Sequence, residues 1–112
     1  MTCDTKTRER ARIIELNDRL RTTFKGGRIQ VHTGLHCLDA QIRGRALYAL
    51  SKYHRFTPDD DHDFGYFTFA GFEFEWEIEY RTEDGVGRSQ DPADPNHTLR
   101  TLTLYVVRDI LP

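Results

Sequence analysis

The chain has 112 residues, of which 38% are hydrophobic and 30% charged, and its formal net charge is -2 at pH 7. A chain of this length buries roughly two thirds of its unfolded surface, which is enough for one hydrophobic core. It has no run of about 18 apolar residues, and its first residues are charged, which argues against a membrane span and a secretory signal. We therefore expect a cytoplasmic protein with a single domain over residues 1–112, of which residues 1–5 are flexible.

The small net charge conceals two halves of opposite sign. Residues 1–56 contain 12 Lys or Arg against 5 Asp or Glu, whereas residues 57–112 contain 4 against 13. Such a split carries information about partners and association but not about the fold. It leaves head-to-tail assembly into a homo-oligomer open.

The first half of the chain predicts two helices with a short strand between them. From Lys6 to Thr23, apolar residues that continue to Phe24 recur at steps of three and four, as in an amphipathic helix. The Gly-Gly pair at 26–27 is expected to end this helix. Ile29 and Val31 alternate with polar residues, which indicates a strand. Asp39 is a suitable N-cap for the second helix.

The second half predicts strands, and its clearest local structure is a hairpin. From Phe72 to Arg81, apolar residues alternate strictly with charged ones, which is the pattern of a strand with one buried face. A two-residue turn at 70–71 would pair this strand with Phe64–Phe69 and place Gly65 opposite Trp76. A last strand is expected over Thr98–Val107. The predicted fold is α+β, with an antiparallel sheet of about four strands and two helices packed on one face.

Several separated motifs occur in order between about Ile13 and Leu104. They are Glu15-Leu16-Asn17-Asp18 with Leu20-Arg21, Gly26-Gly27-Arg28, Phe56-Thr57-Pro58-Asp59, His62-Asp63-Phe64-Gly65, and Asp91-Pro92-Ala93-Asp94-Pro95 followed by Thr98, Arg100 and Leu102-Thr103. Together they resemble a small bacterial domain-of-unknown-function family whose members are frequently encoded on plasmids and other mobile elements. The resemblance implies a setting in which small proteins act on host defence, so that an anti-restriction or anti-CRISPR inhibitor is one implied role.

Four glutamates alternate along the predicted strand over Phe72–Arg81, and they are Glu73, Glu75, Glu77 and Glu79. Residues i and i+2 of a strand lie roughly 6.7 Å apart on one face, and successive nucleic-acid phosphates have a broadly similar spacing. Such a strip could bind a basic protein surface that normally holds nucleic acid, with Asp91 and Asp94 of the following proline-containing loop as further contacts. The simpler interpretation is that the glutamates keep the strand soluble and prevent edge pairing.

Two alternatives come from other residues. Arg8, Arg12 and Arg19 fall near one side of the first helix, which would suit a nucleic-acid-binding module. In the acidic segment 59–63, His62 and Asp63 are weak candidates for metal ligands and therefore for a metal-dependent enzyme, although a solvated turn is the favoured interpretation of this segment.

The sequence as a whole favours a non-enzymatic, cofactor-free accessory factor of a mobile element. Its predicted partner is a basic protein, namely nucleic-acid-binding host machinery, and nucleic acid itself is the partner only in the alternative. Association should weaken as the salt concentration rises.

Overall fold

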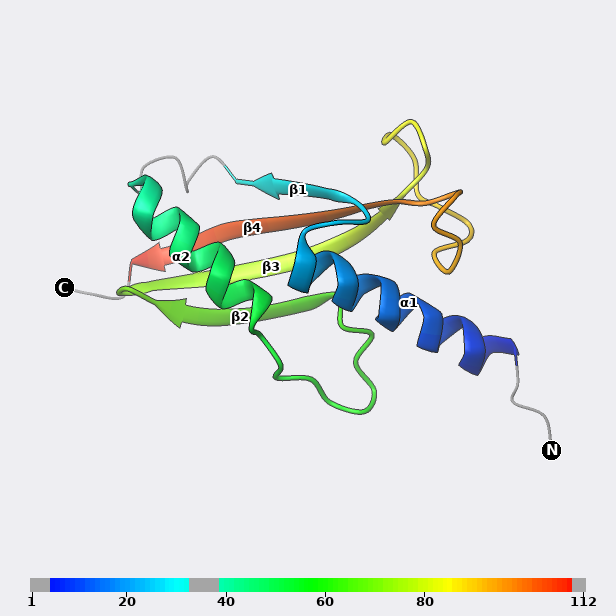
Figure 1. Ribbon diagram of the computed structural model, residues 1–112, viewed down its shortest axis with the longest axis horizontal. Helices are drawn as coiled ribbons and strands as arrows, with labels where there is room; N and C mark the ends of the chain where they lie inside the picture. The colour runs from blue at the N-terminus through cyan, green and yellow to red at the C-terminus, as the bar shows by residue number, and fades with distance from the viewer. Residues whose placement is uncertain (1–4, 33–38, 110–112) are drawn as a thin grey trace.

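The computed structural model describes residues 5–32 and 39–109. In chain order the elements are α1 (Thr5–Thr23), β1 (Arg28–Val31), α2 (Ala40–Ser51), β2 (Phe64–Phe69), β3 (Phe72–Arg81) and β4 (Leu99–Asp109), as Figure 1 shows. The α+β class is confirmed. The prediction that residues 1–5 are flexible falls mostly outside the described residues, and Thr5 itself begins α1.

The four strands form one mixed sheet in the order β1-β4-β3-β2. The pairs β2–β3 and β3–β4 are antiparallel, but β1 runs parallel to β4, with Arg28 opposite Thr101. The expectation of a wholly antiparallel sheet was therefore wrong at one edge. The reason is topological: the chain between β1 and β4 is long enough for a crossover, and a crossover lets two strands run side by side in the same direction.

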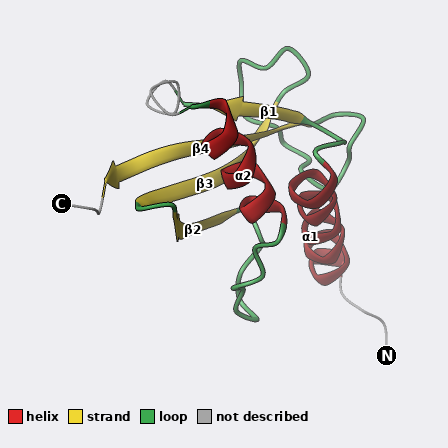
Figure 2. Cartoon of the chain, turned by 60° about the vertical axis from the view of Figure 1, so that its left-hand side comes forward, coloured by secondary structure: helices red, strands yellow, loops and turns green. Residues whose placement is uncertain are grey.

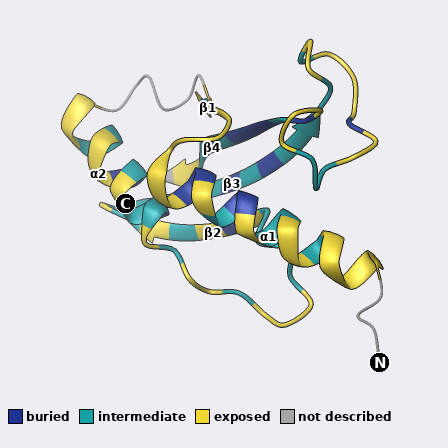
Figure 3. Ribbon diagram, turned by 45° about the vertical axis from the view of Figure 1, so that its right-hand side comes forward, coloured by how far each residue is buried: buried dark blue, intermediate teal, exposed yellow. Residues whose placement is uncertain are grey.

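Both helices pack against one face of the sheet (Figure 2). Leu16 and Leu20 of α1 and Ala46 and Leu50 of α2 are buried there. They meet the inward side chains of the two central strands, which are Phe74, Trp76, Ile78, Leu102 and Leu104. Burial is concentrated in this layer, whereas the start of α1 is exposed and the loops are a mixture of exposed and partly buried residues (Figure 3). No helix in the described ranges is long and apolar enough to cross a membrane.

The hairpin has the predicted register. Gly65 lies opposite Trp76, and a Cβ atom on this glycine would come within 2.6 Å of the Trp76 Nε1 atom. Close packing of the indole on the backbone of β2 therefore requires glycine at this position. Ala70 and Gly71 have φ angles of 55° and 84°, which is the left-handed pair of a type I′ turn.

The helix ends differ in how well they were predicted. The Asp39 side chain accepts a hydrogen bond from the Ile42 N–H at 2.8 Å, so its role as the N-cap of α2 is confirmed. Helix α1, however, ends at Thr23, before Gly26 is reached. The next residue, Phe24, has a φ of 61°, and its N–H donates to the Leu20 carbonyl. The left-handed turn takes Phe24 off the buried stripe of the helix, which is why its ring is 38% exposed rather than in the core.

Candidate functional site

The glutamate strip lies in the middle of the sheet, on the face opposite the helices. Because β3 is flanked by β2 and β4, the strip cannot serve to protect a sheet edge, and that part of the simpler interpretation was wrong. The edge strands are β1 and β2. The four carboxylates are neither fully exposed nor buried, since all four residues belong to the intermediate class.

Arginines of the same chain neutralise two of the four carboxylates. Glu73 accepts from the Arg108 Nε atom at 2.7 Å, and Glu79 accepts from Arg81 at 2.8 Å. Glu75 and Glu77 have no ion pair with any described residue. The unneutralised part of the strip therefore consists of two central carboxylates.

Aromatic rings border these two carboxylates on both neighbouring strands. The β-sheet register places Tyr66 of β2 and Tyr105 of β4 beside Glu75, and Phe64 of β2 beside Glu77. Phe64 and Tyr66 are 45% and 59% exposed. Burial and a hydrogen bond to the Glu77 carboxylate raise the pKa of the Tyr105 hydroxyl. We refer to Phe64, Tyr66, Glu75, Glu77 and Tyr105 together as the acidic–aromatic face.

A hollow of about 220 Å³ opens on this face. It is lined by Phe64, Tyr66, Glu73, Glu75 and Val107. Carboxylates next to aromatic ring faces and an aliphatic wall form a surface suited to a lysine or arginine side chain, whose stem is apolar and whose head is cationic. The hollow thus combines carboxylates, aromatic rings and an aliphatic side chain in one place.

The other predicted site residues lie elsewhere. Asp91 and Asp94 belong to the loop that leads from β3 into β4 at one end of the sheet (Figure 1). The Asp94 carboxylate accepts a hydrogen bond from the Asn96 N–H at 2.8 Å. Of the helix arginines, Arg8 and Arg19 are exposed. Arg12 is ion-paired with Glu15 at 2.9 Å. None of these residues belongs to the acidic–aromatic face.

A second feature, a buried polar network, joins α1 to two loops. Its centre is Asn17, which is completely buried. The Asn17 amide donates to the Tyr80 hydroxyl at 2.8 Å and to the Asp61 carbonyl at 3.1 Å, and it accepts from the Arg100 Nε atom at 2.9 Å. Arg100 also donates to the Pro92 carbonyl, and Tyr80 donates to Asp63 at 2.9 Å.

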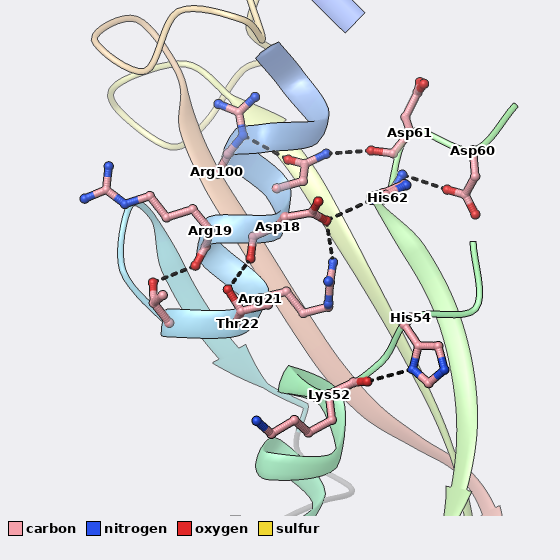
Figure 4. A network of polar contacts seen from close by, with 12 residues as sticks. Asp18, Arg19, Arg21, Thr22, Lys52, His54, Asp60, Asp61, His62 and Arg100 are labelled. Carbon is pink, nitrogen blue, oxygen red and sulfur yellow. Dashed lines mark hydrogen bonds and ion pairs between the residues drawn. The ribbon is translucent and has the colours of Figure 1, made fainter. Parts of the chain in front are cut away.

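An adjoining arm of this network runs through Asp18, as Figure 4 shows. The Asp18 carboxylate lies 2.8 Å from the His62 Nδ1 atom and 2.9 Å from Arg21. His62 has a φ of 60°, and its ring stacks on Phe56 at a centroid distance of 3.8 Å. The contact with a carboxylate requires the proton on Nδ1.

Burial shifts the pKa values of the ionisable groups in the network. Desolvation raises the pKa of Asp63 and of Tyr80, and it lowers the pKa of Arg100. Arg100 is 1% exposed and has no carboxylate partner among the described residues. Neutral groups, the Asn17 amide and the Pro92 carbonyl, thus hold a buried cation, which makes this site costly to disturb.

The side chains of His62 and Asp63 contact different partners. The His62 ring faces Asp18, whereas the Asp63 carboxylate faces Tyr80. The described residues contain no group of three or more His, Cys, Asp or Glu that could hold a metal ion. A cleft of about 360 Å³ does open over Asp63 and Tyr80, but its lining, with Glu79, Arg81 and Arg88 among others, contains no serine, cysteine or histidine. His62 and Asn17 instead connect the 57–63 loop to α1. Arg100 connects the 91–98 loop to α1 through Pro92 and Asn17.

Sequence reasoning missed the centre of the network, although one signal was available. Arg100 lies two residues before Leu102 on β4, so its side chain points to the same inward face of the sheet as the Leu102 side chain. Tyr80 likewise continues the inward side of β3. This alternation could have predicted that Arg100 is buried. It could not have predicted that Asn17, 83 positions away, is its hydrogen-bond partner.

Comparison with known proteins yields one match. A family described as "Protein of unknown function (DUF3768)" matches residues 31–109. The matched range begins at the end of β1, so the motifs at 15–21 and 26–28 lie outside it. No curated protein and no solved structure matches the chain.

Proposed function

The chain belongs to the DUF3768 family, whose description assigns no activity, and we propose that this protein is a non-enzymatic binding protein whose acidic–aromatic face docks on a basic, nucleic-acid-binding protein. One observation carries the proposal. The Glu75 and Glu77 carboxylates lie in the centre of the uncovered sheet face without a cationic partner among the described residues, and exposed rings border them.

The chemistry of this face favours arginine or lysine as the contacting residue. A guanidinium can form paired hydrogen bonds with the Glu75 carboxylate while its plane lies against the Tyr66 ring. Glu73 and Glu79 contribute less, because an incoming cation would first have to displace Arg108 or Arg81. In this proposal the main contacts are therefore made by two carboxylates, Glu75 and Glu77, and not by all four. Attraction between exposed charges is screened by salt, so binding should weaken as ionic strength rises.

The partner class that fits best is a host defence complex that holds nucleic acid in a basic groove. Binding there would inhibit it by steric and electrostatic competition, as an anti-restriction or anti-CRISPR factor would. The motif resemblance to proteins of mobile elements supports this part of the proposal, and the two unpaired carboxylates support the competition with a phosphate backbone.

The test is affinity capture from nuclease-treated host lysate with the wild-type chain and with a Glu75→Lys, Glu77→Lys double variant. Glu9→Lys is the matched control, because it reverses an exposed glutamate on α1. We expect the wild type and the control to retain basic nucleic-acid-binding proteins that elute with salt, and the double variant to lose them while its circular dichroism is unchanged. Equal capture by the double variant would refute the proposal.

A titration against fluorescent single- and double-stranded DNA distinguishes this proposal from direct binding of nucleic acid. If the proposal is right, the protein binds neither DNA. Salt-dependent binding that is lost on Arg8→Glu or Arg19→Glu would replace it with a nucleic-acid-binding module based on Arg8, Arg12 and Arg19.

A further inference from the structure

Strand β2 forms a free edge of the sheet and lacks the usual protection against pairing. Its sequence, Phe-Gly-Tyr-Phe-Thr-Phe, contains no charge and no proline. Its six pairs with β3 are in continuous register, and the irregularity in the sheet lies between β3 and β4 instead. Natural edge strands are normally blunted by charges, prolines or bulges, and a strand without them is a template for another strand.

The backbone groups that face this free edge can be assigned from the register. The Ile78 N–H donates to the Asp63 carbonyl at 2.7 Å, so this pair is a hydrogen-bonded pair of the antiparallel ladder. Hydrogen-bonded and non-hydrogen-bonded pairs alternate, which makes Phe64 and Glu77 a non-hydrogen-bonded pair. The N–H and C=O groups of Phe64, Tyr66 and Thr68 therefore point away from β3, toward the open side.

The side chains of the same residues, Phe64, Tyr66 and Thr68, are exposed. Phe64 and Tyr66 line both the 220 Å³ hollow of the acidic–aromatic face and a second hollow of about 310 Å³. The second hollow also contains Arg55 and Asp60, one cation and one anion. A groove with both signs of charge is complementary to itself, whereas a purely basic peptide would meet Arg55 as a like charge.

We infer that β2 pairs with β2 of a second copy of this chain, antiparallel and about a twofold axis at Tyr66. In this register Tyr66 faces its own counterpart and Phe64 faces Thr68 of the other copy, so that no charged residues oppose each other. Three hydrogen-bonded pairs would supply about six main-chain bonds. A twofold contact is isologous, which is the commonest symmetry of homo-oligomers. The proposed contact shares Phe64 and Tyr66 with the acidic–aromatic face, but it does not depend on what that face binds.

The experiment measures the mass of the full chain by light scattering after size exclusion, over a range of concentrations. We expect the wild type to show twice the 13.1 kDa chain mass. Tyr66→Lys places two like charges at the axis and should give the monomer mass, as should Thr68→Lys. Val86→Lys, at an exposed apolar position in the loop after β3, is the matched control and should keep the dimer mass.

Amide hydrogen exchange gives the second readout. The N–H groups of Phe64, Tyr66 and Thr68 should be protected in the wild type and exchange rapidly in Tyr66→Lys, with unchanged circular dichroism. A wild type that stays monomeric at about 0.5 mM would overturn the inference. So would a Tyr66→Lys variant that remains dimeric, or a dimer that high salt dissociates, since that would indicate charge-driven head-to-tail assembly.

Discussion

Replacing Asn17 by leucine should destabilise the protein strongly, because it leaves a buried cation without its side-chain acceptor. The Arg100 Nε atom donates to Asn17 in a place that water cannot reach. An unpaired buried donor on a charged group costs about 3 kcal/mol or more. The lost bond to the Tyr80 hydroxyl adds about 1 kcal/mol, and the added apolar volume of leucine offsets a similar amount.

The expected decrease in the free energy of unfolding is therefore about 3 kcal/mol, which corresponds to a fall of roughly 13 °C in Tm for a domain of this size. Arg100→Met alone should cost less, because it removes the buried charge and takes the donor only from two neutral acceptors, the Asn17 oxygen and the Pro92 carbonyl. In the double variant neither group is left unpaired. We therefore expect a favourable coupling of about 2 kcal/mol relative to the sum of the single losses.

The assay is urea denaturation at pH 7, followed by the fluorescence of Trp76, the only tryptophan, and by circular dichroism. Gln41→Leu, at an exposed position on α2, controls for the change from a polar side chain to leucine. The reasoning is refuted if Asn17→Leu costs less than about 1 kcal/mol, or if the two single losses simply add in the double variant.

Two further predictions concern the hairpin and the network. Gly65→Ala should lower the free energy of unfolding by about 1–3 kcal/mol, because the new methyl group would lie 2.6 Å from the Trp76 Nε1 atom. In the control Gly44→Ala, on α2, the new methyl group meets nothing within 4 Å, and the free energy of unfolding should rise by about 0.5–1 kcal/mol. Equal effects of the two substitutions in urea denaturation would contradict the steric argument. Asp63 has a pKa raised by burial above its usual 3.8, so its contribution to stability is full below pH 3.8 and is lost as the pH rises through the folded-state pKa. Asp63→Asn should therefore have the higher denaturation midpoint at pH 7, with the difference from wild type closing toward pH 3, and a difference independent of pH would count against the raised pKa.

The hairpin could be predicted from local pattern because both its determinants are local. Strict alternation assigns a face to every residue of β3, and a two-residue turn then determines the register to β2. The glutamates' position on the uncovered face followed from the same alternation. The neutralisation of Glu73 did not, because Arg108 lies on another strand, 35 positions away.

The parallel pairing of β1 could not be predicted for a different reason. Four alternating residues define a strand but carry no information about which strand it will meet or in which direction. The same holds for the network: Asn17 lies next to Leu16 on α1, and only the packing of α1 over β4 brings its amide to Arg100. Composition shows that polar residues are present, whereas tertiary structure decides which of them are buried.

The pairing of β1 also determines the order in which the molecule can fold. Its partner residues on β4 lie 73 positions further along the chain. A four-residue strand does not hold its shape alone, and closing so long a loop costs entropy before any contact is gained. The hairpin can therefore nucleate early from nearby residues, whereas the parallel edge waits for the last strand and is the part of the sheet that forms slowest and opens first.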